Sequence, residues 1–202
     1  MIAIIDYGVG NLFSLVSSFA KLGIEAIVTS DTDVIKKADK LILPGVGAFC
    51  DARQSLKDSG LDEVICREVK SGKPIMGICL GMQLLFEKSY EYGEYDGLGL
   101  LKGKIVAMKG RIPENLKIPH IGWNALIMKK ESDLFKYIKD GDFVYFVHSF
   151  YASGCDDSLL ATAEYGKEVT AAVSKGNIYG CQFHPEKSGD VGLNILRGFN
   201  DL

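Results

Sequence analysis

The sequence lacks any apolar run long enough to cross a bilayer, and no basic segment precedes its first apolar run. We therefore expect neither a membrane protein nor a secretory signal peptide. It also lacks an excess of positive charge, because 23 Lys and Arg residues stand against 26 Asp and Glu residues, for a net charge of −3. Binding of nucleic acid or of an anionic membrane surface is therefore not expected. These absences indicate a cytoplasmic protein.

Cysteine and histidine are few and scattered. The five cysteines are an odd number and no two of them have CxxC spacing, so we expect reduced thiols rather than a disulfide framework. The three histidines lie far apart, whereas zinc ligands occur in short, clustered spacings, so no metal site is expected. It stays open at this point whether one cysteine is reactive.

The composition is that of an ordinary globular protein. Hydrophobic residues make up 47% of the chain and charged residues 24%, which excludes a disordered chain. A chain of this length buries a large core without disulfides or structural metal. No repeat, low-complexity tract or linker divides it, so we expect a single domain over residues 1–202.

The first hundred residues alternate short apolar runs with amphipathic segments. The apolar run Ile2–Ile5 is followed by a helical pattern that begins at Asn11 and is closed by Gly23. Strands that are apolar almost throughout, joined by helices, indicate a parallel sheet covered on both faces. The expected strands are residues 2–5, 24–28, 41–43 and 74–78, and the expected helices are residues 11–22, 33–38, 51–70 with a break near 59–60, and 82–88.

The second half is dominated by strand-like runs. Residues 169–174 and 177–183 are expected to form a hairpin that turns at Lys175 and Gly176. The fold class that follows is α/β, with a mixed, mainly parallel central sheet and an antiparallel extension. The other expected elements are strands over residues 104–108, 123–128, 143–151 and 159–165 and a final helix over residues 191–199.

The stretch Gly77–Gly81 carries the strongest chemical signal. It has the form G-x-C-x-G, with Cys79 at its centre, and lies between an expected strand and an expected helix. A sharp strand-to-helix turn of this form strains the backbone at the nucleophile and needs small neighbours. It also places the thiol at a helix N-terminus, whose partial positive charge favours the thiolate. The alternative is an inert core cysteine between two glycines, and the strand–turn–helix context favours the nucleophile.

A cysteine nucleophile needs a base, and the base needs a group that orients it. The candidates are His184 and Glu186, at the end of the expected strand over residues 177–183. In an extended segment, residues two apart point the same way, and Pro185 between them stiffens the link. Glu186 could then bind one ring nitrogen while the other faces the thiol. The alternative is a surface histidine beside a solvated glutamate.

Three further motifs are less specific. The loop Pro44–Gly47 could present backbone N–H groups to an anionic centre, or it is only a tight turn. Gly8–Phe13 begins like a dinucleotide fingerprint, but phenylalanine occupies the third glycine position, which argues against NAD. The segment Pro119–Asn124 contains the only tryptophan. It is either a buried strand entry or a docking surface in which Trp123 and Asn124 contact a partner.

These blocks resemble the class I, or triad, glutamine amidotransferases, whose two signatures are matched by Gly77–Gln83 and His184–Glu186. Within that family the resemblance is closest to the glutaminase subunits of imidazole glycerol phosphate synthases, which act in histidine biosynthesis. It extends from the first expected strand to the last helix, and no triad position departs from the pattern. The blocks that carry it are Asp6–Asn11, Pro44–Phe49, Gly77–Gln83, Pro119–Asn124 and His184–Ser188.

The resemblance implies a flavodoxin-like three-layer α/β fold and the hydrolysis of L-glutamine to glutamate and ammonia through a Cys thioester. It implies no cofactor and no metal. The ammonia would pass through a tunnel to a separate (β/α)8-barrel cyclase subunit in a heterodimer, which would form imidazole glycerol phosphate and aminoimidazole carboxamide ribotide. A chain of 202 residues has no room for the barrel, so we expect the acceptor chemistry on another chain.

The same resemblance assigns roles to individual residues. The catalytic residues would be Cys79, His184 and Glu186, with Cys79 as nucleophile. Backbone N–H groups would stabilise the oxyanion, and a side chain with two neighbouring main-chain positions would hold the substrate. The implied oxyanion positions are Leu80, Val46 and Gly47, and the implied substrate positions are Gln83, Ser149 and Phe150.

Two alternatives stay open. The chain could be the glutaminase subunit of another triad amidotransferase, serving pyridoxal phosphate, purine or anthranilate synthesis, which the product of the partner reaction would distinguish. It could also be a non-catalytic flavodoxin-like regulatory module with an inert Cys79. Stoichiometric labelling of Cys79 by a glutamine-like electrophile would favour catalysis, and no labelling would favour the module.

Overall fold

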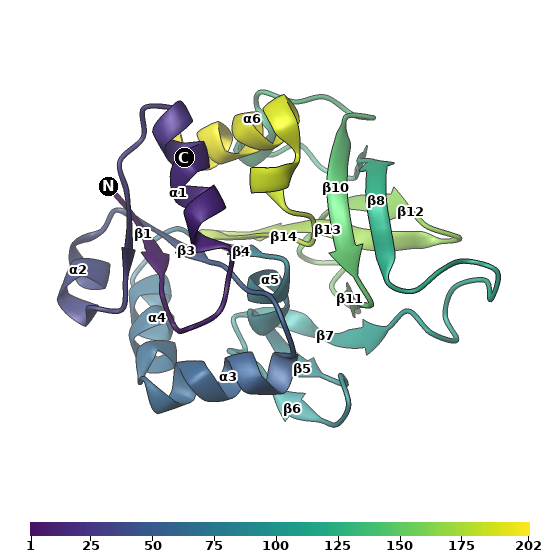
Figure 1. Ribbon diagram of the computed structural model, residues 1–202, viewed down its shortest axis with the longest axis horizontal. Helices are drawn as coiled ribbons and strands as arrows, with labels where there is room; N and C mark the ends of the chain where they lie inside the picture. The colour runs from purple at the N-terminus through teal and green to yellow at the C-terminus, as the bar shows by residue number, and fades with distance from the viewer.

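The computed structural model describes residues 1–202 as three sheets, with helices packed around the largest of them (Figure 1). None of the helices has the length and apolar character that a membrane span requires. The helices are α1 (Leu12–Lys21), α2 (Thr32–Lys37), α3 (Phe49–Asp58), α4 (Leu61–Lys70), α5 (Leu80–Leu84) and α6 (Gly189–Asn200), with 3-10 turns at Asp133–Phe135 and Pro185–Lys187.

The central sheet has eight strands in the order β2-β1-β3-β4-β14-β13-β12-β9. The first five pair in parallel, and the pairs from β14 to β9 are antiparallel. This confirms the predicted mixed sheet with an antiparallel extension. Its strands are β1 (Ile2–Ile5), β2 (Ala26–Thr29), β3 (Lys40–Leu43), β4 (Ile75–Ile78), β9 (Ile127–Met128), β12 (Leu159–Glu164), β13 (Glu168–Lys175) and β14 (Ile178–Cys181).

Alternate residues of the central strands supply two hydrophobic cores, one on each face of the sheet. Along β1, Ala3 and Ile5 pack with residues of α3 and α4, whereas Ile2 and Ile4 pack with residues of α1 and α6 on the other face (Figure 1). All four β1 residues are buried, which is why the run shows no polar alternation. Because both faces are covered, a site can form only at the strand ends and in the loops that follow them.

Two smaller sheets lie beside the antiparallel part. The first is an antiparallel ribbon of β8 (His120–Ala125) and β10 (Phe143–His148), which we call the β8–β10 ribbon. The second has four strands in the order β11-β7-β5-β6. These are β5 (Phe86–Ser89), β6 (Tyr95–Asp96), β7 (Leu101–Ala107) and β11 (Phe150–Ser153).

Two of the predicted strands are divided in the structure. The sequence predicts one strand over residues 143–151, but the chain changes partner at Ser149, because β10 pairs with β8 and β11 pairs with β7. The Ser149 carbonyl accepts a hydrogen bond from the Met108 N–H at 2.9 Å. The run over residues 123–128 divides at Leu126 for the same reason, because β8 pairs with β10 and β9 pairs with β12.

The predicted helix over residues 82–88 is wrong in its second half. α5 ends at Leu84, and the chain continues as β5. The carbonyl groups of residues 84–87 accept hydrogen bonds from the N–H groups of residues 97–101, at 2.8–3.1 Å. A longer helix would need those carbonyls for its own turns, so contacts from further along the chain override the local helical pattern.

The short helix α5 lies very close to the sheet, and glycines make this approach possible. A Cβ added at Gly77 would lie 2.6 Å from backbone atoms of Gly81 and Met82. One added at Gly180, which pairs with Gly77 in the neighbouring strand, would lie 2.4 Å from the Met82 side chain. Cys79 stands between β4 and α5, so its position depends on these contacts.

We predict that Gly77→Ala lowers the free energy of unfolding by about 1–3 kcal/mol, the usual cost of overpacking a core. Urea denaturation of the purified chain measures this loss. Gly176→Ala, in the turn between β13 and β14, serves as control, because its added Cβ meets no atom within 4 Å and only its positive φ, +59°, disfavours alanine. A loss at Gly77 no larger than the loss at Gly176 would contradict the close packing of α5.

Candidate active site

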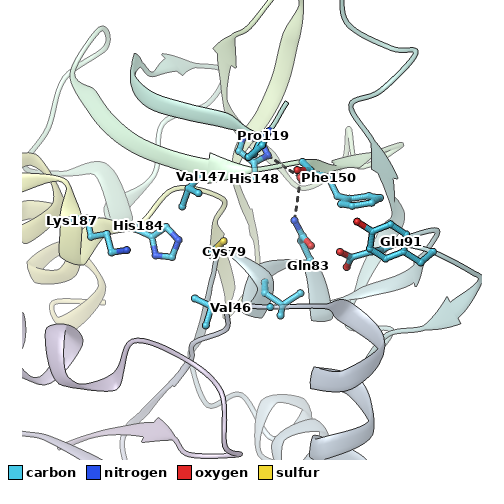
Figure 2. Close-up of a pocket in the computed structure, with 14 residues that line it drawn as sticks. Val46, Cys79, Gln83, Glu91, Pro119, Val147, His148, Phe150, His184 and Lys187 are labelled. Carbon is cyan, nitrogen blue, oxygen red and sulfur yellow. Dashed lines mark hydrogen bonds between the residues drawn. The ribbon is translucent and has the colours of Figure 1, made fainter. Parts of the chain in front are cut away.

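The residues that the sequence points to meet in one pocket of about 350 Å³ beside the end of β4. Figure 2 shows several of them around it, and this volume suits a small ligand. Glu186 is not on the pocket wall, but its carboxylate binds Nδ1 of the His184 ring. The expected residues on the wall are Val46, Gly47, Cys79, Leu80, Gln83, Ser149, Phe150 and His184.

Cys79 occupies a strained turn between β4 and α5. Its φ is +55°, a left-handed backbone that residues with a Cβ rarely adopt, and the turn holds it there. The Cys79 N–H donates to the Cys181 carbonyl at 2.7 Å, and the Cys79 carbonyl accepts from the Gln83 N–H at 3.2 Å. All five cysteines are free, and Cys79 is the only one on the pocket wall. The structure therefore contains the strained strand-to-helix turn that the sequence predicts.

His184 is held in place by the β8–β10 ribbon. Its N–H donates to the Tyr145 carbonyl at 3.0 Å, and its carbonyl accepts from the Ser188 hydroxyl at 2.6 Å. The same hydroxyl oxygen accepts a hydrogen bond from the Tyr145 N–H at 3.0 Å. The backbone of His184 is thus fixed on both sides, and its ring lies in the pocket beside the Cys79 sulfur (Figure 2).

The two ring nitrogens of His184 have different surroundings. Nδ1 donates to Glu186 Oε1 at 2.8 Å, and the two side chains are 3% and 1% exposed. Nε2 has no hydrogen-bond partner in the subunit, which leaves it available for proton transfer. Burial lowers the pKa of His184, but the contacts with Cys79 and Glu186 outweigh burial and raise the pKa to about 9. The ring is therefore protonated at neutral pH.

Backbone N–H groups near the thiol can bind a negative oxygen. Leu80 is the first residue of α5, so its N–H has no acceptor within the helix. Val46 and Gly47 line the same pocket, and Gly47 has a φ of +100°, which glycine adopts without strain. The base of their loop is fixed by Tyr7, to which the sequence assigns no role: its hydroxyl donates to the Pro44 carbonyl at 2.6 Å. Burial and the nearby Cys79 raise the pKa of Tyr7, so the hydroxyl keeps its proton.

The structure brings Gln83, Ser149 and Phe150 together on one wall of the pocket. The Gln83 amide donates to the Phe150 carbonyl at 3.2 Å and to Gln182 Oε1 at 2.9 Å. The Gln182 amide in turn donates to the Cys79 sulfur at 3.7 Å. Gln83 is therefore positioned by partners on β11 and next to β14, and Gln182 is a further polar neighbour of the thiol that the sequence does not single out.

Glu91 and Tyr92 are also on the pocket wall, although no motif of the sequence contains them, and so is Lys187, from the block His184–Ser188. Glu91 is buried, and its carboxylate accepts a hydrogen bond from the Phe49 N–H at 2.8 Å. Burial raises the pKa of Glu91, and this hydrogen bond opposes the rise. Glu91 and Tyr92 lie between β5 and β6 and reach the pocket only through the packing of that sheet, so local patterns could not reveal them.

Trp123 and Asn124 lie outside the pocket, on the β8–β10 ribbon. Trp123 is 52% exposed, and its ring packs edge-on against Tyr145 with the centroids 5.9 Å apart. Ile121 and Phe143, on the same face of the ribbon, are also exposed. Asn124 differs, because its side chain makes hydrogen bonds within the subunit, one of them to the His120 ring at 2.8 Å. The exposed face of the ribbon is therefore apolar.

Comparison with known proteins identifies relatives that match the chain over nearly its full length. The profile of the family described as Glutamine amidotransferase class-I matches residues 3–200. The imidazole glycerol phosphate synthase subunit HisH of Caldanaerobacter subterraneus subsp. tengcongensis is 51% identical to the chain, over 100% of this chain and 98% of its own length. The subunit of the same name from Lactococcus lactis subsp. lactis is 51% identical over 98% of this chain and 96% of its own length.

A solved structure extends the similarity to the fold. PurLQS from Thermotoga maritima superimposes with a TM-score of 0.75, over 99% of this chain and 97% of that chain, at 21% sequence identity. At this identity the likeness concerns the fold alone. The family profile and the two relatives show that this chain belongs to the class I glutamine amidotransferases and, within them, to the HisH subunits of imidazole glycerol phosphate synthase.

Proposed function

We propose that the chain hydrolyses L-glutamine to glutamate and ammonia, as the glutaminase subunit of an imidazole glycerol phosphate synthase. The observation that carries the proposal is the strained Cys79 in one pocket with His184, whose ring is bound to the buried Glu186 at 2.8 Å. The names of the HisH relatives, which match over nearly their full length, support the identity of the synthase. We further infer that residues 1–202 act as one cytoplasmic domain without a cofactor.

In the first half of the proposed reaction, the Cys79 sulfur, as a thiolate beside the protonated His184, attacks the side-chain amide carbon of glutamine. The new C–S bond forms as the C=O electrons move to oxygen, and N–H groups of Leu80 and the Val46–Gly47 segment donate to that oxyanion. His184 gives its Nε2 proton to the amide nitrogen, which leaves as ammonia. The oxyanion collapses to a thioester on Cys79. Glu186 keeps the imidazole in position throughout.

In the second half, water hydrolyses the thioester. His184, now neutral, takes a proton from the water as its oxygen attacks the thioester carbon. The C–S bond breaks, glutamate leaves, and Cys79 is again a thiolate beside a protonated imidazole. The raised pKa of His184 fits this cycle, because the ring must hold a proton before attack and regain one from water.

The pocket wall also carries groups suited to the amino acid end of glutamine. Glu91 is the only carboxylate on the wall, and an α-ammonium group needs such a partner. Gln83 and Phe150 lie near Glu91 in the pocket (Figure 2), and Ser149, next to Phe150 in the chain, also lines it. We assign the binding of the α-ammonium group to Glu91 and the orientation of the substrate to Gln83 and the Ser149–Phe150 main chain.

We place the ammonia-accepting subunit, a (β/α)8-barrel cyclase, on the exposed face of the β8–β10 ribbon. Trp123 and its neighbours Ile121 and Phe143 are exposed there, and a partner would cover this apolar surface. The ribbon also reaches the pocket, because Pro119, next to β8, and Val147, in β10, line it. Asn124 supports the ribbon from within and is not assigned to the contact.

Replacing the nucleophile tests the function directly. In the complex with the cyclase, Cys79→Ala should abolish synthesis of imidazole glycerol phosphate from glutamine and leave synthesis from added ammonia intact, because the acceptor chemistry needs ammonia and not this thiol. Product formation with each nitrogen source measures both activities. Cys50→Ala, outside the pocket, is the matched control and should retain both. Glutamine turnover by Cys79→Ala would remove Cys79 from the mechanism.

The raised pKa of His184 makes stability depend on pH. The folded chain binds this proton more tightly than the unfolded chain, because the pKa rises from 6.5 to about 9. The stabilisation is therefore full below pH 6.5 and is lost as the pH rises through 9. We predict that the unfolding free energy of the wild type, minus that of His184→Gln, decreases by up to about 3 kcal/mol between pH 6 and pH 10. Urea denaturation across this range measures the difference, and a constant difference would contradict the raised pKa.

Neutralising Glu91 tests its role in substrate binding. Glu91→Gln keeps the shape of the side chain but removes its charge, so the KM for glutamine should rise about 10–100-fold while kcat changes less. Steady-state glutamine hydrolysis by the complex measures both constants. Glu94→Gln, an exposed neighbour paired with Lys88, is the control and should leave KM unchanged. An unaltered KM in Glu91→Gln would exclude it from the substrate site.

A further inference from the structure

A continuous chain of hydrogen bonds connects the β8–β10 ribbon to the pocket. His148 Nδ1 lies 2.8 Å from the Phe150 carbonyl oxygen, and His148 Nε2 lies 3.0 Å from His120 Nδ1. Both histidines are buried. Figure 2 shows the part in which His148 and Gln83 meet the same Phe150 carbonyl. In order, the chain runs from the Glu164 carbonyl through Asn124, His120, His148, the Phe150 carbonyl, Gln83 and Gln182 to the Cys79 sulfur.

Both ends of the histidine pair require a donor. A carbonyl oxygen only accepts, so His148 Nδ1 must carry a proton that points to Phe150. Asn124 turns its NH2 group to the Glu164 carbonyl at 2.8 Å, so it presents its oxygen to His120 Nε2, which must also carry a proton. The contact between His120 Nδ1 and His148 Nε2 needs a third proton, because one of these two nitrogens must donate. Two neutral imidazoles hold two protons, whereas this geometry uses three.

The third proton belongs on His120. Burial lowers the pKa of His148 to about 4, so that ring stays neutral, with its proton on Nδ1. Burial also lowers the pKa of His120 below its usual value, because the hydrogen bond to Asn124 offsets the loss of solvent only in part. The contact with His148 Nε2 acts in the opposite direction, because this acceptor needs a donor from His120 Nδ1. The His120 ring stacks on Tyr165 and Phe146, with centroids 3.9 and 5.0 Å away, and aromatic faces stabilise a cation. A neutral His120 has one proton for two acceptors. It would leave an unprotonated nitrogen facing either His148 Nε2 or the Asn124 oxygen.

We propose that His120 is an imidazolium in the folded subunit, and that His120 and His148 are positioning residues for glutamine hydrolysis. His120 donates to His148 Nε2 and thereby keeps the His148 proton on Nδ1, where it binds the Phe150 carbonyl. The Gln83 amide binds that same carbonyl and so depends on its position. The positioning role rests on the proposed function, whereas the proton count does not.

The protonation of His120 and His148 depends on pH and on the charges of the groups near the two rings. The titratable groups that face it are His184, whose charge disfavours a proton on His148, and Tyr165, which stacks on His120. Phe146 is uncharged, and Glu164 contributes only its main-chain carbonyl, through Asn124. When His120 loses its second ring proton, it can no longer donate to both His148 and Asn124, and the chain of hydrogen bonds is interrupted at one of these two contacts.

Nuclear magnetic resonance of the full chain with 15N-labelled histidine tests the proton count, because the sequence has only three histidines. At pH 7 we expect protons on both ring nitrogens of His120 and on Nδ1 alone of His148. His184→Gln and His120→Gln assign the signals. Asn124→Leu removes the acceptor at Nε2, so His120 should become neutral with its proton on Nδ1. A neutral His120 in the wild type, or a proton on Nε2 of His148, would overturn the proposal.

Glutamine hydrolysis by the complex with the cyclase tests the positioning role. His148→Leu removes the donor to Phe150 and should raise the KM for glutamine about tenfold, with a smaller change in kcat. His148→Gln, whose amide can donate to Phe150 and accept from His120, should recover most of this loss. Tyr165→Phe is the control, because it keeps the ring stack and loses only a hydroxyl that binds the Lys117 carbonyl.

The outcomes separate the two proposals. Equal KM values for the Leu and Gln variants at position 148, with both chains folded in thermal unfolding, would mean that His148 only fills space, and would overturn the positioning role. If the wild-type complex does not hydrolyse glutamine, the proposed function fails and the positioning role with it. The resonance spectra then still decide whether His120 carries the third proton.

Discussion

The close approach of α5 to the central sheet is the constraint on which the site depends. Gly77 and Gly180 leave no side chain between the strands and the helix, and this brings the first turn of α5 directly onto β4. The chain must then reverse within one residue, which holds Cys79 at a φ of +55°. The packing of the buried β4 and α5, on either side of the turn, holds the backbone in this strained conformation. The positions of Cys79 and of the first N–H groups of α5 thus depend on one packing contact.

Burial lowers the pKa of both His184 and His148, and the groups that each ring faces decide the net shift. At His184, the contacts with the Cys79 sulfur and the buried Glu186 carboxylate more than offset the loss of solvent, so the pKa rises. At His148, the partners are a carbonyl and a second histidine, so the loss of solvent prevails and the pKa falls. One ring is therefore ready to donate a proton, and the other is a neutral donor of fixed direction. In our proposals the same residue type serves chemistry at His184 and positioning at His148.

The chain crosses between sheets at Ser149, and this crossing joins the ribbon to the pocket. β10 carries Tyr145, whose carbonyl holds the backbone of His184, and ends at His148. β11 begins at Phe150, whose carbonyl receives both His148 and Gln83. A partner bound at Trp123 would therefore contact the same ribbon that holds the backbone of His184 through Tyr145.

The sequence by itself determined the βα units, the mixed sheet and the strained turn at Cys79, because apolar runs, glycines and short motifs report on local backbone geometry. The pairing of His184 with Glu186 was also local, since the two residues are separated only by Pro185. The end of α5, the division of the strand at Ser149, and the place of Glu91 and Tyr7 were decided by tertiary structure. These features depend on hydrogen-bond partners and pocket walls that distant segments contribute. The direction and proton state of a side chain such as His120 likewise follow from its neighbours in space, which local patterns do not show.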